Sequence, residues 1–293
     1  MSHKAGFVNI IGYPNVGKST LMNAMVGEKL SIITSKAQTT RHRIMGIVNG
    51  DDFQIVYSDT PGIIRNPSYK MHELMNSFIE TALVDADIML LIVEPGQRFE
   101  EQEIIEKFNF SGIPVLILIN KIDLSDQEKV VSEIEYWQQF MPKAEVIPIS
   151  ALNKFNVEKV FDRIMHYLPE NEAYFDKEDL TDRSERFFVS EIIREKILLN
   201  YQKEIPYSVE ITVESFKETE RLVKIAANII VDRETQKAII LGHQGKSIKK
   251  MGTQARLDIE EFLGKKVFLE LTVKVDKEWR NSETSLRRFG YNQ

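Results

Sequence analysis

The chain has 293 residues, a length that suits one medium-sized domain followed by a smaller one. It contains no cysteine, which excludes disulfides, thiolate zinc sites and cysteine nucleophiles. The net charge of -6 argues against general nucleic-acid binding, but a small basic excess from Asp182 onward leaves a phosphate-binding surface open in that part of the chain.

Short apolar runs alternate with helical patterns through residue 168. The helical patterns cover Thr20–Met25, Lys70–Val84 and Ser132–Phe140, and two of the runs between them are apolar throughout, as strands buried on both faces are. This alternation predicts an α/β domain over residues 1–170 with a doubly wound, mostly parallel sheet. The predicted strands are Phe7–Ile11, Phe53–Tyr57, Ile88–Val93, Val115–Ile119 and Glu145–Ile149.

The pattern changes after a polar, acidic segment, and we interpret residues 171–184 as a linker. Residues 185–293 then predict a smaller α+β domain with the order α-β-β-α-α-β. Its last helix carries apolar residues on one face, and Gly264 ends it. The predicted elements are the helices Arg186–Tyr201, Thr235–Leu241 and Ser247–Leu263 and the strands Val209–Val213, Val223–Val231 and Val267–Val275.

The segment Gly12–Ser19 has the form G-x-x-x-x-G-K-S and lies between a predicted strand and a predicted helix, which is the context of a P-loop. Its backbone amides would surround phosphates, aided by the helix N-terminus. Lys18 would place a positive charge near the β- and γ-phosphates, and Ser19 would offer a hydroxyl to Mg²⁺. The alternative is a glycine-rich turn with an exposed lysine. The predicted nucleotide-binding residues here are Gly12, Tyr13, Pro14, Asn15, Val16, Gly17, Lys18, Ser19 and Thr20.

A second motif, Asp59-Thr60-Pro61-Gly62, follows a predicted strand. A carboxylate at that place can hold Mg²⁺ directly or through water, and the N–H of Gly62 can reach a γ-phosphate. A threonine in the loop Gln38–Arg41 can also bind Mg²⁺ and sense the γ-phosphate, and we prefer Thr40 to Thr39. The predicted Mg²⁺ ligands are Ser19, Thr40 and Asp59, and the second motif adds Asp59, Thr60, Pro61, Gly62 and Ile63 to the nucleotide site.

A third motif, Asn120-Lys121-Ile122-Asp123, follows the strand Val115–Ile119. The carboxylate of Asp123 can accept both the N1 and the N2 hydrogens of guanine, and adenine lacks that pair, so the motif predicts guanine specificity. Asn120 would brace the P-loop, and the stem of Lys121 would cover the base. The remaining predicted contacts to the base are Ile122 and the loop residues Ser150, Ala151 and Leu152.

Hydrolysis is predicted to be slow, because Ile63 stands where Ras-like enzymes carry the glutamine that orients water. Catalysis would then be mainly electrostatic. The predicted catalytic groups are Lys18, Asn15, Thr40 and Gly62. Arg41 and Arg43 could supply further positive charge, but we interpret them as solvated residues of a mobile loop.

The order of these motifs, the asparagine and proline of the P-loop and the Asp-Thr-Pro-Gly form resemble the Era-like group of P-loop GTPases. In related GTPases, an asparagine at the place of Asn15 helps to bind a K⁺ ion that acts where an arginine finger would. The resemblance therefore implies K⁺ activation in addition to Mg²⁺. The alternative is that Asn15 only shapes the loop.

In the second domain, Gly242-His243-Gln244-Gly245 joins two predicted helices. A tight Gly-x-x-Gly turn lets a single-stranded RNA backbone approach closely, and Ile239, Ile240 and Ile248 could form a groove for unstacked bases. With its flanking strands the segment looks like a type II KH domain. The predicted RNA-binding residues are Gly242, His243, Gln244, Gly245, Lys246, Lys249 and Lys250.

The segments Asp182–Ile197 and Leu286–Tyr291 also look like the Era family, so the resemblance covers essentially the whole chain. One departure is Ile64–Tyr69, which has fewer basic residues than many members have. The resemblance implies binding of GTP and GDP, binding of the 3′ end of 16S rRNA, a role in 30S ribosomal subunit assembly, and peripheral association with the inner membrane. No apolar run approaches the length of a membrane span and no signal-peptide pattern precedes the first strand, so we expect a cytoplasmic protein. We also expect a monomer.

The leading hypothesis is a GTP-controlled RNA-binding assembly factor. The first alternative is a GTPase switch that acts on a membrane or cell-cycle protein and uses the KH-like domain as a protein adaptor. The weak basic excess of the second part keeps that alternative open. A plain metabolic NTPase is disfavoured, because the sequence carries no second catalytic constellation.

Overall fold

The computed structural model describes residues 3–291, which divide into two compact units, each with its own sheet. The first unit comprises the described residues up to Asn66 together with Met75–Asp182. The second comprises Pro67–Leu74 together with the described residues from Arg183 onward. In the described part of the chain, no helix is both long enough and apolar enough to cross a membrane.

The first unit is built on a six-stranded sheet with the order β2-β3-β1-β4-β5-β6. All neighbours pair in parallel except β2, which runs antiparallel to β3 at the edge. β4 and β5 are buried along their whole length, as their apolar sequences predict. The strands are β1 (Lys4–Ile11), β2 (Ile44–Asn49), β3 (Phe53–Asp59), β4 (Ile88–Val93), β5 (Val115–Ile119) and β6 (Glu145–Pro148).

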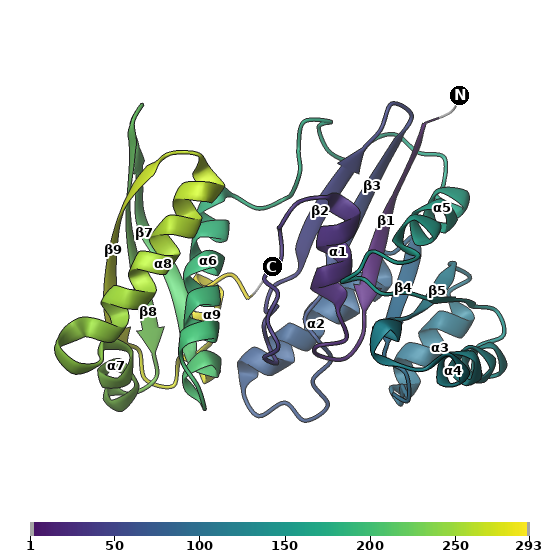
Figure 1. The fold of residues 1–293 in the computed structure, drawn as a ribbon, viewed down its shortest axis with the longest axis horizontal. Coiled ribbons are helices and arrows are strands. Elements are labelled where there is room, and N and C mark those ends of the chain that lie inside the picture. The colour runs from purple at the N-terminus through teal and green to yellow at the C-terminus, as the bar shows by residue number, and fades with distance from the viewer. Residues whose placement is uncertain (1–2, 292–293) are drawn as a thin grey trace. The chain divides into compact units, whose positions relative to one another are not determined.

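Helices cover both faces of this sheet (Figure 1), which confirms the predicted doubly wound α/β class. β2, α3 and α5 are not among the predicted elements. α4 begins before the predicted Ser132, because the side chain of Asp126 caps it by accepting from the amide of Lys129. The helices are α1 (Lys18–Val26), α2 (Lys70–Val84, which belongs to this unit from Met75 onward), α3 (Gln102–Phe110), α4 (Gln127–Phe140) and α5 (Val157–Tyr167), with a short 3-10 turn η1 (Ile122–Leu124).

The polar segment after α5 runs along the edge of the same sheet. The amide of Ile47 in β2 donates to the carbonyl of Leu180 at 2.9 Å. The Oε1 atom of Gln54 in β3 accepts from the amides of Tyr174 and Phe175, at 2.7 and 3.0 Å. The first of these bonds satisfies a backbone N–H that the edge strand β2 would otherwise leave open to other chains.

The second unit has a three-stranded sheet with the order β7-β8-β9, antiparallel between β7 and β8 and parallel between β8 and β9. Helices α6, α7 and α8 lie on one face of it (Figure 1), which confirms the predicted α+β class and the order α-β-β-α-α-β. The elements are α6 (Glu185–Asn200), η2 (Ile205–Tyr207), β7 (Val209–Glu218), β8 (Leu222–Val231), α7 (Glu234–Leu241), η3 (His243–Gly245), α8 (Lys246–Leu263), β9 (Lys266–Val275), η4 (Trp279–Asn281) and α9 (Glu283–Arg288).

The core of the second unit lies between the helices and the inner face of the sheet. Met251, Ala255 and Ile259 of α8 are fully buried there, one turn apart on a single face. α8 ends at Gly264, whose φ of 64° is in the left-handed region, so glycine suits this C-cap. α8 is thereby fixed with its N-terminus at the Gly-x-x-Gly turn.

Candidate nucleotide site and Gly-x-x-Gly turn

A cavity of about 480 Å³ lies where the P-loop, the loop before β2 and the loops after β5 and β6 meet. The three sequence motifs that are far apart in the chain therefore surround one space. The lining residues are Pro14, Asn15, Gly17, Lys18, Ser19, Thr20, Ile32, Ile33, Thr34, Ser35, Gln38, Thr39, Thr40, Gly62, Asn120, Lys121, Asp123, Leu124, Ser150 and Leu152.

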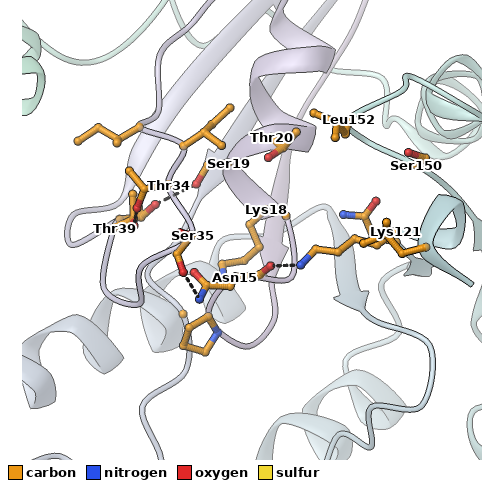
Figure 2. A pocket seen from close by; sticks show the side chains of 18 of the residues that line it. Asn15, Lys18, Ser19, Thr20, Thr34, Ser35, Thr39, Lys121, Ser150 and Leu152 are labelled. Carbon is orange, nitrogen blue, oxygen red and sulfur yellow. Dashed lines mark hydrogen bonds between the residues drawn. The ribbon is translucent and has the colours of Figure 1, made fainter. Parts of the chain in front are cut away.

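Lys18 lies inside the P-loop (Figure 2), at the first position of α1. Its Nζ atom donates to the carbonyls of Gly12 and Tyr13 at 3.1 and 2.8 Å, and its side chain is almost fully buried. Burial lowers the pKa of Lys18 to about 8, and the nearby carboxylate of Asp59 opposes part of that shift. The lysine is thus a buried cation held in place before any phosphate is bound.

Three side chains with oxygen atoms that could bind a metal, Ser19, Thr40 and Asp59, meet beside Lys18. The hydroxyl of Ser19 donates to Oδ2 of Asp59 at 2.7 Å and lies 2.9 Å from the hydroxyl of Thr40. The hydroxyl of Thr40 donates to the same Oδ2 atom at 3.2 Å. The Oδ1 atom of Asp59 is buried with no hydrogen-bond partner among the described residues, and burial raises the pKa of this carboxyl. An unpaired carboxylate oxygen beside two hydroxyls fits a hard cation such as Mg²⁺.

The neighbouring Thr39 points to a different set of atoms. Its hydroxyl donates to the carbonyl of Lys36 at 2.6 Å and lies 2.7 Å from the hydroxyl of Thr34. Thr40 is therefore the threonine of this loop that reaches Ser19 and Asp59.

Asn120 joins the P-loop to the loop after β6. Its Nδ2 atom donates to the carbonyl of Val16 at 2.7 Å, and its Oδ1 atom accepts from the amide of Ala151 at 2.9 Å. A Cβ on Gly17 would lie 2.2 Å from Nδ2 of Asn120, so the close approach requires glycine there. Asp123, Leu124 and Leu152 are exposed at this end of the cavity and are free to contact a base.

Asn15 has a φ of 66° and contacts two neighbouring segments (Figure 2). Its Nδ2 atom donates to the carbonyl of Ser35 at 3.0 Å. Its own carbonyl accepts from Nζ of Lys121 at 2.6 Å, and Lys121 also pairs with Glu94. The P-loop asparagine thus lies beside a carbonyl of the loop that carries Thr40.

The interpretation of Arg41 and Arg43 as solvated residues is wrong. Both side chains are almost fully buried. Arg43 donates to Ser58 at 2.6 Å and to Asp85 at 2.6 and 3.0 Å, because it enters the sheet at β2, where two polar partners on neighbouring elements receive its guanidinium. Arg43 therefore anchors the end of the loop that we call switch I, residues 31–43.

Sequence reasoning missed the first half of switch I as part of the lining. Ile32, Ile33, Thr34 and Ser35 line the cavity with Gln38, although none belongs to a motif. The only signal was their position shortly before the paired threonines. Tyr13, in contrast, is in the P-loop, but its hydroxyl donates to Glu101 at 2.9 Å, outside the cavity lining.

The Gly-x-x-Gly turn of the second unit joins α7 to α8. Gly242, Gln244 and Gly245 have φ values of 67°, 53° and 73°, and a Cβ on Gly242 would lie 2.5 Å from the side chain of Ser247. The other predicted RNA contacts, His243, Gln244, Lys246, Lys249 and Lys250, are exposed around this turn.

The three isoleucines predicted to form a groove differ in their exposure to solvent. Ile239 is half exposed, and Ile248 is partly buried against the core. Ile240 is fully buried in the core, so its inclusion in a groove is wrong. Its neighbour faces solvent because adjacent residues of α7 point in different directions around the helix.

The site geometry and the two sheets define a P-loop GTPase domain followed by a KH domain. Residues 7–121 match the family model described as 50S ribosome-binding GTPase, and residues 204–280 match the KH domain model. The chain belongs to the Era family of GTPases.

Relatives of similar length support this assignment. The chain is 47% identical to GTPase Era of Syntrophus aciditrophicus over 99% of this chain and 96% of the relative. It is 43% identical to GTPase Era of Clostridium kluyveri over 98% and 99%. Two solved Era structures each align with a TM-score of 0.94 at 37% identity, over 99% of this chain and 100% of the other. One is in complex with MgGDPNP and nucleotides 1506–1542 of 16S rRNA, and the other, from Aquifex aeolicus, is a variant bound to GDP·AlF4⁻.

The buried position of Lys18 predicts a pH dependence of nucleotide affinity. Above pH 8 the free protein loses the Lys18 proton, whereas bound phosphates favour the charged ammonium, so binding must take up a proton. We expect the affinity for GDP, measured with a fluorescent analogue in the presence of a chelator, to be flat from pH 7 to 8. It should then fall by up to about tenfold per pH unit toward pH 9. In a Lys18→Met variant, the affinity for GDP should no longer fall above pH 8. The same fall in both proteins would contradict a contact between Lys18 and the bound phosphates.

Proposed function

We propose that this GTPase uses its nucleotide state to control the binding of single-stranded RNA at the Gly-x-x-Gly turn, with the 3′ end of 16S rRNA as its target and 30S subunit assembly as its role. The observation that carries the proposal is the joint presence of a built nucleotide site and an exposed, lysine-flanked KH turn in one chain. The Era complex with MgGDPNP and 16S rRNA supports the choice of ligands. Cytoplasmic location and loose association with the inner membrane follow from the same family resemblance.

At the phosphate end, Lys18 would exchange its bonds to the P-loop carbonyls for oxygens of the β- and γ-phosphates. Ser19 and Thr40 would bind Mg²⁺, and Asp59 would hold it directly or through water with the buried Oδ1 atom that lacks a partner. The bound Mg²⁺ would supply charge neutralisation for the phosphates. At the base end, Asp123 would accept two hydrogens from guanine, while Asn120 keeps its loop against the P-loop.

Hydrolysis would be slow and mainly electrostatic, because Ile63 has no side-chain group that can orient water. Its side chain is buried, and its amide donates to the carbonyl of Gly12 at 3.3 Å. Gly62 lines the cavity, so its amide can donate to the γ-phosphate. Thr40 joins the metal ligands to switch I, which links loss of the γ-phosphate to a rearrangement of that loop.

Asn15 is the residue that would recruit K⁺. Its side-chain oxygen and the nearby carbonyl of Ser35 are two neutral oxygen donors at the phosphate end of the cavity. We expect kcat to fall by about tenfold or more when K⁺ is replaced by Na⁺, the size of effect that a lost cationic group at the phosphates gives. Turnover assays at constant ionic strength measure it, with Asn15→Ala as the variant that should no longer respond. An equal kcat in the two salts would exclude activation of hydrolysis by K⁺.

Phosphates of the RNA would contact the lysines and backbone amides of the Gly-x-x-Gly turn. The side chains of His243 and Gln244 point to solvent between two glycines. A His243→Asp, Gln244→Asp double substitution should weaken binding of a 16S rRNA 3′-end oligonucleotide by about a hundredfold, because two negative charges would face the RNA backbone. Fluorescence anisotropy with the GTP-analogue-bound protein measures this.

A charge-matched control lies elsewhere in the second unit. Lys217 and Lys224 are exposed on the sheet, and replacing both by Gln lowers the net charge by the same amount, two units, away from the turn. RNA affinity that falls equally in both double variants would show that binding is not centred on the turn. Wild-type affinity in the first variant would remove the KH turn from the proposed function.

A further inference from the structure

Arg65 joins three segments beside the P-loop, although it belongs to none of the sequence motifs. It lies just after Gly62 and Ile63, in the segment 59–66 that we call switch II. Its guanidinium carbon lies 4.7 Å from the centroid of the Tyr13 ring, and its Nη2 atom donates to the Tyr13 hydroxyl. Its Nε atom donates to Glu101 at 2.9 Å, and Nη2 also lies 3.1 Å from Glu100.

Tyr13 is a rigid partner for this arginine. Its ring is buried and lies against Phe99, with the centroids 5.2 Å apart. Its hydroxyl donates to Glu101 at 2.9 Å and accepts from the amide of Glu100 at 3.2 Å. The P-loop tyrosine is therefore fixed to the loop after β4, and Arg65 attaches switch II to that fixed pair. We call Tyr13, Arg65, Glu100 and Glu101 the Arg65 cluster.

The backbone of switch II lies directly on the P-loop next to the cluster. The amide of Ile63 donates to the carbonyl of Gly12, and a Cβ on Gly62 would lie 2.7 Å from the backbone of Pro14. On the far side, Asn76 of α2 bonds both the amide and the carbonyl of Ile64, at 3.1 and 2.9 Å. The cluster and Asn76 thus hold the residues that follow Gly62 at two points.

We propose that Arg65 is a positioning residue that keeps switch II closed on the P-loop, so that the amide of Gly62 faces the γ-phosphate. The inference rests on the proposed function, which assigns that contact to Gly62. Only the closed arrangement can offer the Gly62 amide to a γ-phosphate, so any interaction that favours it raises the affinity for GTP relative to GDP. GDP has no γ-phosphate and is insensitive to this arrangement.

The expected effect is moderate, because half of the Arg65 side chain is exposed to solvent. We expect Arg65→Ala to lower the affinity for a non-hydrolysable GTP analogue by about three- to tenfold and to leave the affinity for GDP unchanged. Arg65→Lys keeps the charge beside the glutamates but loses the planar stacking, so it should recover part of the loss. Tyr13→Phe keeps the ring and loses the hydroxyl, so it should lie between wild type and Arg65→Ala.

The chain offers a matched control in Arg98. Its guanidinium carbon lies 3.8 Å from the centroid of the Tyr136 ring, and it pairs with Glu133 at 2.7 Å. This second arginine–tyrosine–glutamate cluster involves the loop after β4 and α4, not the P-loop. Arg98→Ala should leave the ratio of the two affinities at its wild-type value.

Isothermal titration of the full chain with GDP and with the GTP analogue, in saturating Mg²⁺, tests the inference. A reduced ratio in Arg65→Ala but not in Arg98→Ala supports it. An unchanged ratio, or an equal loss of affinity for both nucleotides, overturns it. Gly62→Ala distinguishes a failure of this inference from a failure of the proposed function. If Gly62→Ala also leaves the ratio of GTP-analogue to GDP affinity unchanged, the γ-phosphate contact of the proposed function is rejected. If Gly62→Ala reduces that ratio and Arg65→Ala does not, only the role of Arg65 is rejected.

Discussion

Replacing Asp123 by Asn should lower the affinity for GTP by about a thousandfold or more and create affinity for xanthosine nucleotides. Asp123 lies exposed at the base end of the cavity, on the turn that follows β5. Its carboxylate would accept both the N1 and N2 hydrogens of guanine. An amide at the same place has one acceptor and one donor group, so its NH₂ would oppose the guanine N2 amino group. Xanthine carries a carbonyl there and would pair with the amide.

Competition binding with GDP, ATP and xanthosine diphosphate measures this exchange of specificity. Asp162→Asn, an exposed position on α5 remote from the motifs, removes the same charge and should leave GDP affinity unaltered. If Asp123→Asn still prefers GDP to xanthosine diphosphate, the base is recognised by other groups.

Replacing Lys18 by Met should lower kcat by about a hundred- to a thousandfold without lowering the free energy of unfolding. The ammonium group is buried, and its lowered pKa means that the folded protein holds this proton less tightly than the unfolded chain does. Removing the charge therefore relieves a desolvation cost, while methionine fills a similar volume. The substitution should therefore lower kcat and leave the free energy of unfolding unchanged or higher, as expected for a side chain that serves catalysis rather than stability.

Single-turnover hydrolysis and urea denaturation of the nucleotide-free protein measure the two effects of Lys18→Met. Lys159→Met, at an exposed position of α5, should change neither quantity appreciably. A Lys18→Met protein that hydrolyses GTP at the wild-type rate would exclude the lysine from the phosphate site.

The sequence predicted the phosphate and base motifs because each is a short run with fixed spacing on a strand end. The P-loop, Asp59 and Asn120 occupy the carboxyl ends of β1, β3 and β5, which are parallel strands of one sheet, so their convergence follows from the topology. The sequence alone does not separate Thr40 from Thr39, because neighbouring threonines in an irregular loop carry no periodic signal.

The errors arose where tertiary packing overrides local composition. β2 was missed because the short run Ile44–Asn49 follows charged residues and is an edge strand stabilised by β3 and by the segment near Leu180. Arg43 was interpreted as solvated because burial of a guanidinium depends on Ser58 and Asp85, which are distant in sequence. The Arg65 cluster likewise depends on contacts that no local pattern encodes.

The central claim is that nucleotide state controls RNA binding. Its most direct test is the affinity for a 16S rRNA 3′-end oligonucleotide, measured by anisotropy on one protein preparation saturated in turn with GDP and with a non-hydrolysable GTP analogue at fixed salt. We expect binding to be tighter by about fivefold or more in the GTP-analogue state, the lower end of coupling between two sites. Equal affinities in the two states would mean that the GTPase and KH domains are uncoupled and would contradict it.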